Sequence, residues 1–193
     1  KAVEEMAGEW IELYAMRKVA RGFVYPPPDT SFAEFESRFV FEETPDQIKT
    51  LQEVEQDLVS DKPMDRLVCG DVGFGKTEIA LRTAFRVAAE GRQVAVLVPT
   101  TILCQQHFET FAKRFAPFAM EVDFVSRFKS SQDNKATLEK LAQGKIDIIV
   151  GTHRLLSKDV HFQNLGLLVL DEEHRFGVKH KERIKTFRNK IDV

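Results

Sequence analysis

Cysteine is scarce in this sequence of 193 residues. Cys69 and Cys104 stand alone, with neither a CxxC pair nor a metal-ligand spacing, which favours a reducing compartment and a cytoplasmic location. Long apolar runs are missing too: stretches such as VAVLV are far shorter than the roughly 20 residues of a membrane helix. The pattern therefore predicts neither a membrane span nor a signal peptide, and no membrane partner.

A large excess of one charge is also absent. The 28 lysines and arginines nearly balance the 30 aspartates and glutamates, which leaves a net charge of −2. This excludes a general cationic field for nucleic acid, so any such contact must come from a local surface or from backbone amides. What is present, 43% hydrophobic and 30% charged residues, is typical of an ordinary folded protein. A chain of this length buries roughly 70% of its unfolded surface, enough for a sheet covered on both faces.

From residue 66 onward, short apolar runs alternate with helical stretches. The runs predict strands at 66–69, 93–98, 121–125, 147–150 and 165–170, and the helical stretches are 76–90, 101–115 and 134–144. Strands that alternate with helices indicate a parallel sheet with right-handed crossovers, and uninterrupted apolar strands indicate burial on both faces. The predicted fold class is α/β, a mainly parallel sheet covered by helices on both faces.

The first 60 residues are predicted to be helical with two breaks. Apolar residues mark one face of a first helix within residues 1–25, which either packs on its own domain or links it to another part of a longer protein. After the prolines at 26–28, Ser31 and Glu34 have the spacing of a capping box. The predicted division is a linker helix (1–25), a helical lead-in (26–60) and a core (61–193). The apolar positions behind it are Val3, Met6, Trp10, Leu13, Phe32, Phe35, Phe39, Ile48, Leu51, Val54 and Leu58.

The stretch CGDVGFGKTEIA, at residues 69–80, fits the pattern G-x-x-x-x-G-K-[ST]. A predicted strand precedes it and a helix follows it, so that glycine-rich backbone amides and a helix N-terminus would face a phosphate group. Lys76 would reach the β- and γ-phosphates, and Thr77 would coordinate Mg²⁺. The alternative is a glycine-rich turn without a ligand. The predicted nucleotide contacts are Gly70, Asp71, Val72, Gly73, Phe74, Gly75, Lys76 and Thr77.

A pair of acidic residues follows the apolar run 165–170. Strand ends are where ligands gather in open α/β sheets. Asp171 suits Mg²⁺ or its bound water, and Glu172 could orient and deprotonate an attacking water. The alternative is the N-terminus of a helix, which favours acidic residues. Together with the phosphate loop, the pair favours nucleotide hydrolysis over small-molecule phosphorylation, with Glu172, Lys76 and Asp171 as the catalytic set.

With these motifs in order, the chain resembles the superfamily 2 helicases and translocases, whose motor lobes have a RecA-like fold. GDVGFGKT and DEEH look like motifs I and II. TPDQ looks like the Q motif, and the resemblance implies that Gln47 reads the adenine edge of ATP while Phe41 packs on its ring. The alternative for Gln47 is structural, because Thr44 and Gln47 also have capping-box spacing with Pro45 at the first helical position.

The resemblance also implies a DNA-binding surface. VPTTILCQQ looks like motif Ia and GTHRLL like motif Ib, segments that hold the nucleic-acid backbone with hydroxyls and amides in this family. His174, in DEEH, would relay the state of the nucleotide to a later motif. The residues implied to contact DNA are Thr100, Thr101, Gln106, Arg127, Thr152 and His153.

Finer details are similar to the branch that contains the RecG-like fork helicases and the bacterial transcription-repair coupling factors. Glu173 and the stretch MDRLVCGDVGFGKTE favour the coupling factors. That resemblance implies a motor that uses ATP to track along duplex DNA, removes stalled RNA polymerase and recruits excision-repair proteins. It also implies a second RecA-like lobe with an arginine finger, which these residues do not include. We therefore expect this lobe to bind nucleotide but to hydrolyse it poorly.

Of the other histidines, His107 and His161 lack partners at metal spacing. His180 belongs to a basic cluster with Lys179, Lys181 and Arg183, which could contact DNA or the second lobe, or form a solvated helix face. Two further alternatives are a stand-alone nucleotide-binding interaction module and a P-loop kinase, although the sequence offers no candidate for a kinase lid.

Overall fold

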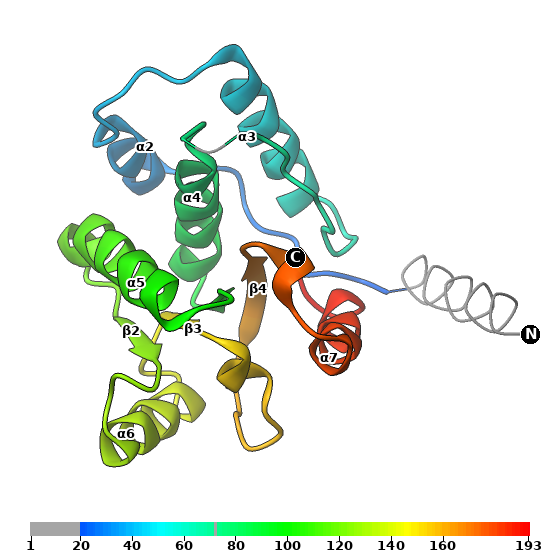
Figure 1. Cartoon of the computed structure of the whole chain (residues 1–193). Helices are drawn as coiled ribbons and strands as arrows, with labels where there is room; N and C mark the ends of the chain where they lie inside the picture. The colour runs from blue at the N-terminus through cyan, green and yellow to red at the C-terminus, as the bar shows by residue number, and fades with distance from the viewer. Residues whose placement is uncertain (1–19, 72) are drawn as a thin grey trace, which may run out of the picture.

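The computed structural model describes residues 20–71 and 73–193 (Figure 1). The apolar face predicted for the first helix lies outside the described residues, as does Val72. Residues 20–29 carry no helix, yet Tyr25 in this segment is buried against the core. Within the described part, no helix is long and apolar enough to cross a membrane.

A parallel sheet of four assigned strands forms the centre of the molecule. The strands are β1 (Gln93–Leu97), β2 (Val122–Val125), β3 (Ile148–Gly151) and β4 (Leu165–Leu170), in the spatial order β2-β3-β1-β4. All three pairings are parallel, as the alternation of strands and helices predicted. The α/β fold class is thereby confirmed.

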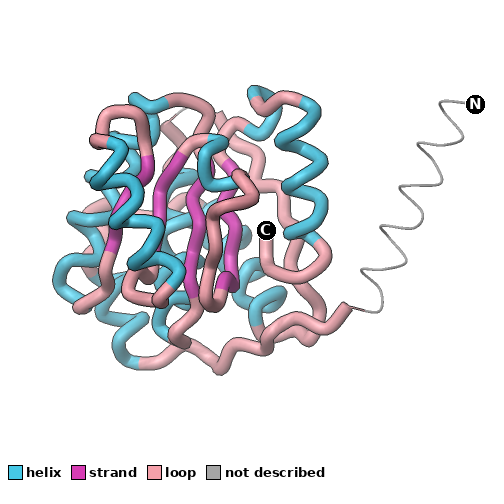
Figure 2. The backbone as a smooth tube through the Cα atoms, turned by 90° about the horizontal axis from the view of Figure 1, so that it is seen from below, coloured by secondary structure: helices cyan, strands magenta, loops and turns pink. Residues whose placement is uncertain are grey.

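Helices cover both faces of this sheet (Figure 2). Val94 and Val96 point into one core together with α4 (Lys76–Ala89) and α5 (Thr101–Phe115). Ala95 and Leu97 point into the other core, which α6 (Ser131–Ala142) and α7 (Val178–Arg188) cover. The alternation follows from the strand period of two, and it explains why β1 is buried along its whole length. The described residues also include the short 3-10 helices η1 (Ala116–Phe118), η2 (His153–Leu156) and η3 (Glu173–Arg175), of which η2 adds Leu155 and Leu156 to the core.

The strand predicted at 66–69 is wrong, since the structure assigns no strand there. A strand needs a continuous ladder of backbone hydrogen bonds. Here Val193 donates to the Met64 carbonyl and accepts from the Arg66 amide, while Asp192 bridges to Leu167 of β4. The segment is thus placed beside the sheet edge through residues 64 and 66, but Leu67 is 82% exposed. The phosphate loop consequently follows an extended segment rather than a regular strand.

Two helices of the lead-in pack on α4. They are α2 (Thr30–Ser37) and α3 (Pro45–Leu58). The capping box predicted at Ser31 is wrong: the N-cap of α2 is Asp29, whose carboxylate accepts from the Phe32 amide at 2.9 Å, and Ser31 donates to the same oxygen. The capping box of Thr44 and Gln47 is formed, with Pro45 at the first position of α3.

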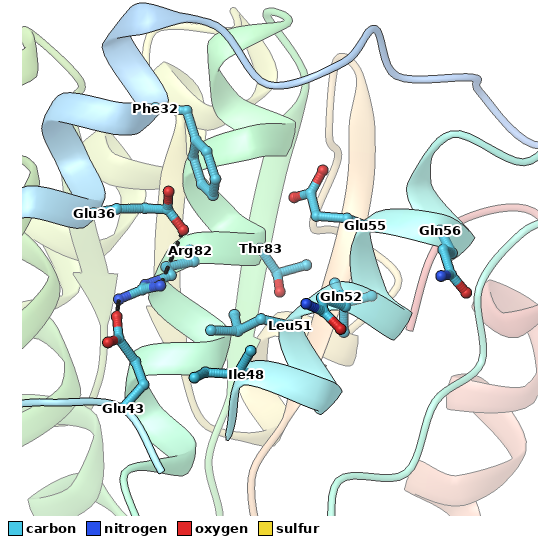
Figure 3. Close-up of a pocket in the computed structure, with 11 residues that line it drawn as sticks. Phe32, Glu36, Glu43, Ile48, Leu51, Gln52, Glu55, Gln56, Arg82 and Thr83 are labelled. Atoms are coloured by element: carbon cyan, nitrogen blue, oxygen red, sulfur yellow. Dashed lines mark hydrogen bonds and ion pairs between the residues drawn. The ribbon is translucent and has the colours of Figure 1, made fainter. Parts of the chain in front are cut away.

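Buried arginines hold α4 against this lead-in. The Arg82 side chain is 4% exposed and pairs with the carboxylates of Glu36 and Glu43 (Figure 3). It also pairs with the carboxylate of Glu78 on its own helix. Arg86 pairs with Glu55 of α3 at 3.0 Å. A buried guanidinium requires such partners, because an uncompensated charge in the interior is costly. Between α2, α3 and α4 lies a cavity of about 500 Å³, which Phe32, Ile48 and Leu51 help to line.

Candidate functional site

The phosphate loop turns on glycines with positive φ. Gly73 has a φ of +88°, and Gly75, the N-cap of α4, has a φ of +69°. Side chains with a Cβ rarely adopt this conformation. At Gly75 a Cβ would also lie 2.3 Å from the Gln47 Nε2. The backbone conformation therefore favours glycine at residue 75, and a Cβ there would also force the end of the Gln47 side chain to move.

The Lys76 side chain folds back over the loop. Its ammonium group donates to the carbonyl oxygens of Gly70, at 2.5 Å, and Asp71, at 2.8 Å. Thr77 follows as the second residue of α4 and is half-buried. A cation over a curled loop, at the positive end of a helix, is an arrangement suited to phosphate oxygens.

Gln47 joins the lead-in to this loop. Its Oε1 accepts from the Thr44 amide at 2.8 Å, and its Nε2 donates to the Phe74 carbonyl at 2.7 Å. The structural interpretation of this residue is therefore confirmed, and a contact with the loop is added that the sequence did not indicate. Phe41 is 72% exposed, with its ring 5.6 Å from that of Phe39. The packing of Phe41 on adenine therefore stays a prediction.

Asp171 lies directly after β4, at the same edge of the sheet as the loop. Its backbone amide donates to the Leu97 carbonyl at 2.9 Å, and its Oδ2 lies 3.0 Å from the Nε2 of His107. The hydrogen bond from His107 is the largest cause of the lowered pKa of this carboxyl group, and the nearby Lys76 ammonium lowers it further. Asp171 is therefore ionised at neutral pH and shares one neighbourhood with Lys76.

His107 is the residue of this site that the sequence analysis missed. It lies on α5 between Cys104 and Phe111, both fully buried, and its own side chain is 15% exposed. The available signal was this helical spacing, which turns His107 toward the sheet edge where Asp171 ends its strand. A search for metal-ligand spacing could not find it, because its partner is 64 residues away in the chain.

The acidic pair continues into a strained turn. Glu172 has a φ of +52°, an uncommon conformation for a residue with a side chain, and its carboxylate lies 3.1 Å from the Arg175 guanidinium. Glu173 accepts from Arg188 of α7 at 2.7 Å, and His174 is exposed. The turn thus holds Glu172 beside Asp171 and leaves His174 on the surface.

The residues predicted to contact DNA follow the carboxyl ends of β1, β2 and β3. Thr100 is the N-cap of α5, with its hydroxyl accepting from the Leu103 amide at 3.2 Å. Gln106 and Arg127 are exposed, whereas Thr152 is buried, with 7% of its surface exposed. Thr101 is the first residue of α5.

Motif Ib lies against α7. The His153 ring stacks on the His180 ring with centroids 4.9 Å apart. His180 belongs to the basic cluster of α7, so this cluster lies next to the predicted DNA-binding segment.

Among residues 20–71 and 73–193, no group of three or more His, Cys, Asp or Glu side chains could hold a metal ion. The candidates that remain are the Thr77 hydroxyl and the Asp171 carboxylate. Hard oxygen donors in such small number suit Mg²⁺, which is commonly held by one or two protein groups together with substrate phosphates.

A phosphate loop and an acidic pair at one edge of a parallel sheet define a nucleotide-binding domain of the helicase class. The family described as DEAD/DEAH box helicase matches residues 44–192, and the chain belongs to this family. It is 51% identical over all 193 residues to the transcription-repair-coupling factors of Staphylococcus haemolyticus (strain JCSC1435) and Staphylococcus aureus (strain USA300). The chain spans 16% of the length of these relatives.

Two solved structures share the fold. The structure of RecG bound to a three-way DNA junction superposes with a TM-score of 0.79 at 35% identity, over 86% of this chain and 23% of that one. A hypothetical ATP-dependent RNA helicase from Sulfolobus tokodaii superposes with a TM-score of 0.62 at 20% identity, over 82% of this chain and 46% of that one. The predicted resemblance to the coupling factors and RecG, and the RecA-like fold, are confirmed.

Proposed function

We propose that this chain is the ATP-binding lobe of a DNA translocase that couples ATP hydrolysis to movement along duplex DNA. The observation that carries the proposal is the arrangement of two groups: the Lys76 ammonium over the glycine-turned loop, and the Asp171 carboxylate at the end of β4. Phosphate binding needs the first group and Mg²⁺ binding needs the second. Identity of 51% to coupling factors over the whole chain supports the choice of motor.

In this proposal the loop residues 70–77 hold the phosphates of ATP, with Gln47 and Phe41 at the adenine. Thr77 and Asp171 hold Mg²⁺, which would neutralise charge on the phosphate oxygens when bound. Glu172 orients the attacking water and accepts its proton. His174, exposed beside this pair, passes the state of the site to another part of the protein.

A second RecA-like lobe completes the hydrolytic site in this proposal. An arginine finger is worth about 10³–10⁵ in the rate of phosphoryl transfer. We expect this lobe alone to bind ATP and to turn it over slowly.

The partners follow from the same relatives. Duplex DNA would lie along the carboxyl edge of the sheet, over Thr100, Thr101, Gln106, Arg127 and His153, with the stacked His153 and His180 extending the contact to α7. The relatives named transcription-repair-coupling factor support stalled RNA polymerase and excision-repair proteins as the larger partners. The RecG structure supports a second candidate, a motor that acts on branched DNA.

The test is steady-state ATP turnover by this chain, with and without duplex DNA, alongside a direct measurement of nucleotide binding. Binding with negligible turnover in both conditions is the expected result. Rapid turnover would show that the catalytic set is complete within these residues. It would overturn the proposal that a second lobe completes the hydrolytic site. Tight nucleotide binding that DNA never alters would instead favour a stand-alone nucleotide-binding module. The same measurement with a three-way junction in place of linear duplex distinguishes the RecG-like candidate from the coupling-factor candidate.

A further inference from the structure

His107 lies where α5 passes the end of β4. Its imidazole is 15% exposed, and its Nε2 lies 3.0 Å from the Asp171 Oδ2. Its Nδ1 is buried and has no hydrogen-bond partner among the described residues. Among the described residues, the Asp171 carboxylate is therefore the hydrogen-bond partner of the His107 ring.

The direction of this hydrogen bond follows from the two groups. At neutral pH Asp171 is a carboxylate, which can only accept. The hydrogen of the imidazole therefore sits on Nε2 and is donated to Oδ2. A carboxylate with one oxygen held in this way can offer its other oxygen to Mg²⁺ or to a water bound by the ion.

Asp171 is thus fixed at two points by two different elements. Its backbone amide is tied to Leu97 at the end of β1, and its side chain is tied to His107 on α5. The first bond sets where the residue sits, and the second sets which way the carboxylate faces. Hydrogen-bonding partners behind a ligating group orient it, and their loss typically lowers metal affinity about 10- to 100-fold.

We propose that His107 is a positioning residue for the Mg²⁺–nucleotide site, which orients the Asp171 carboxylate without touching the nucleotide. The inference rests on the proposed function, because it takes Asp171 as the residue that meets Mg²⁺. The inference also gives α5 a second role. The N-cap of this helix is Thr100, a predicted DNA contact, and the same helix carries His107, which orients the Asp171 carboxylate.

The experiment compares two substitutions that differ in where they place a hydrogen-bond donor. The amide nitrogen of Gln reaches about as far as the histidine Nε2, whereas that of Asn reaches only as far as Nδ1. Binding of a fluorescent methylanthraniloyl derivative of ATP to the 193-residue chain is measured in EDTA and over a titration with MgCl₂. The proteins compared are wild type, His107→Gln, His107→Asn, Asp171→Asn and the double variant with His107→Asn and Asp171→Asn. Glu109→Ala, an exposed position on the same helix, is the matched control. Thermal melts establish that each variant is folded.

Nucleotide binding should tighten as Mg²⁺ is added, and the midpoint of this Mg²⁺ titration is the quantity compared. We expect the midpoint for His107→Asn to lie at an Mg²⁺ concentration about tenfold higher than for wild type. His107→Gln and Glu109→Ala should stay within about twofold of wild type, and binding in EDTA should be equal in all folded variants. Adding His107→Asn to Asp171→Asn should have no further effect, because the pair acts as one unit.

Three results would overturn the inference: an unchanged Mg²⁺ requirement in His107→Asn, an equal loss in EDTA, or effects of His107→Asn and Asp171→Asn that add independently. A wild-type chain that binds no nucleotide would overturn the proposed function instead. These failures are distinguishable, since the first three require a wild type that binds nucleotide.

Discussion

The Gln47 Nε2 donates a hydrogen bond to the Phe74 carbonyl at 2.7 Å, and this bond connects the start of α3 to the tip of the phosphate loop. The same side chain closes the capping box through its Oε1. One amide therefore serves a helix end with its oxygen and the loop with its nitrogen.

Because the two contacts use different atoms, substitutions can separate them. Gln47→Glu keeps the capping-box acceptor, but a carboxylate cannot donate to the Phe74 carbonyl. We expect Gln47→Glu to unfold in urea like the wild type while binding ATP more weakly, and Gln47→Ala to lose about 1 kcal/mol of stability as well. Equal affinity of the wild type for ATP and GTP would contradict the adenine role of Gln47.

Lys76→Ala tests the assignment of the loop. A hydrogen bond to a charged group contributes about 1.5–3 kcal/mol, which corresponds to a loss of about 10- to 100-fold in affinity for ATP. Isothermal calorimetry on the wild type and the variant measures this loss. Lys113→Ala, an exposed lysine on α5, controls for the change in net charge. A Lys76→Ala variant that bound ATP as tightly as the wild type would show that the loop is a turn without a ligand.

Arg82→Ala tests how α4 is held in place. Removal of one partner of a buried ion pair costs about 3–5 kcal/mol. Glu78 would keep Arg114 as a partner at 3.0 Å, so the lower end, about 3 kcal/mol, is expected in urea unfolding. The comparison is Arg38→Ala, whose partner Glu34 is on the surface and where about 0–1 kcal/mol is expected. Similar losses for the two variants would mean that the buried network contributes little.

Asp192 makes stability depend on pH. Burial, the largest cause, raises the pKa of its carboxyl group from 3.8 to about 6. Between about pH 4 and pH 6 the folded state therefore keeps a proton that the unfolded state releases. The free energy of unfolding should fall as pH rises through this window, on the order of 2–3 kcal/mol, and this contribution should be constant above it.

Asp192→Asn should remove that contribution, because the amide does not titrate while its oxygen can still accept from the Met64 amide, as Asp192 does. Urea unfolding of both proteins from about pH 4 to pH 7 gives the difference directly. We expect the variant to match the wild type near pH 4 and to be more stable at pH 7. Parallel stability curves would rule out a raised pKa for Asp192.

The sequence predicted best what local pattern determines. Four of the five strands and the helix after the phosphate loop follow from apolar periodicity and loop chemistry. The capping box at Thr44 is equally local. The strand at 66–69 was wrong because hydrophobic residues do not by themselves supply a backbone partner, and the available partner is Val193 at the other end of the chain.

The misses share this dependence on distant residues. Asp29 rather than Ser31 caps α2, a choice between two good capping residues that spacing alone cannot make. His107 was given no role because its partner is near only in the folded chain. The hydrogen bond between Gln47 and the Phe74 carbonyl also joins residues that are near each other only in the folded chain. The sequence explained Gln47 by its helix cap and gave no sign of this second contact.

The enclosure of α4 has a consequence for motion. Residues 78–88 of this helix are buried almost without interruption, whereas Gly70, Asp71, Gly73 and Phe74 of the loop are exposed. Amide protons of the helix interior should therefore exchange with deuterium only when the whole domain opens, while those of the loop exchange through local fluctuations. A nucleotide would slow exchange in the loop directly, and because it stabilises the folded state it would also slow the global opening through which α4 exchanges. The helix is thus the rigid support of the site, and the loop is the segment that moves locally.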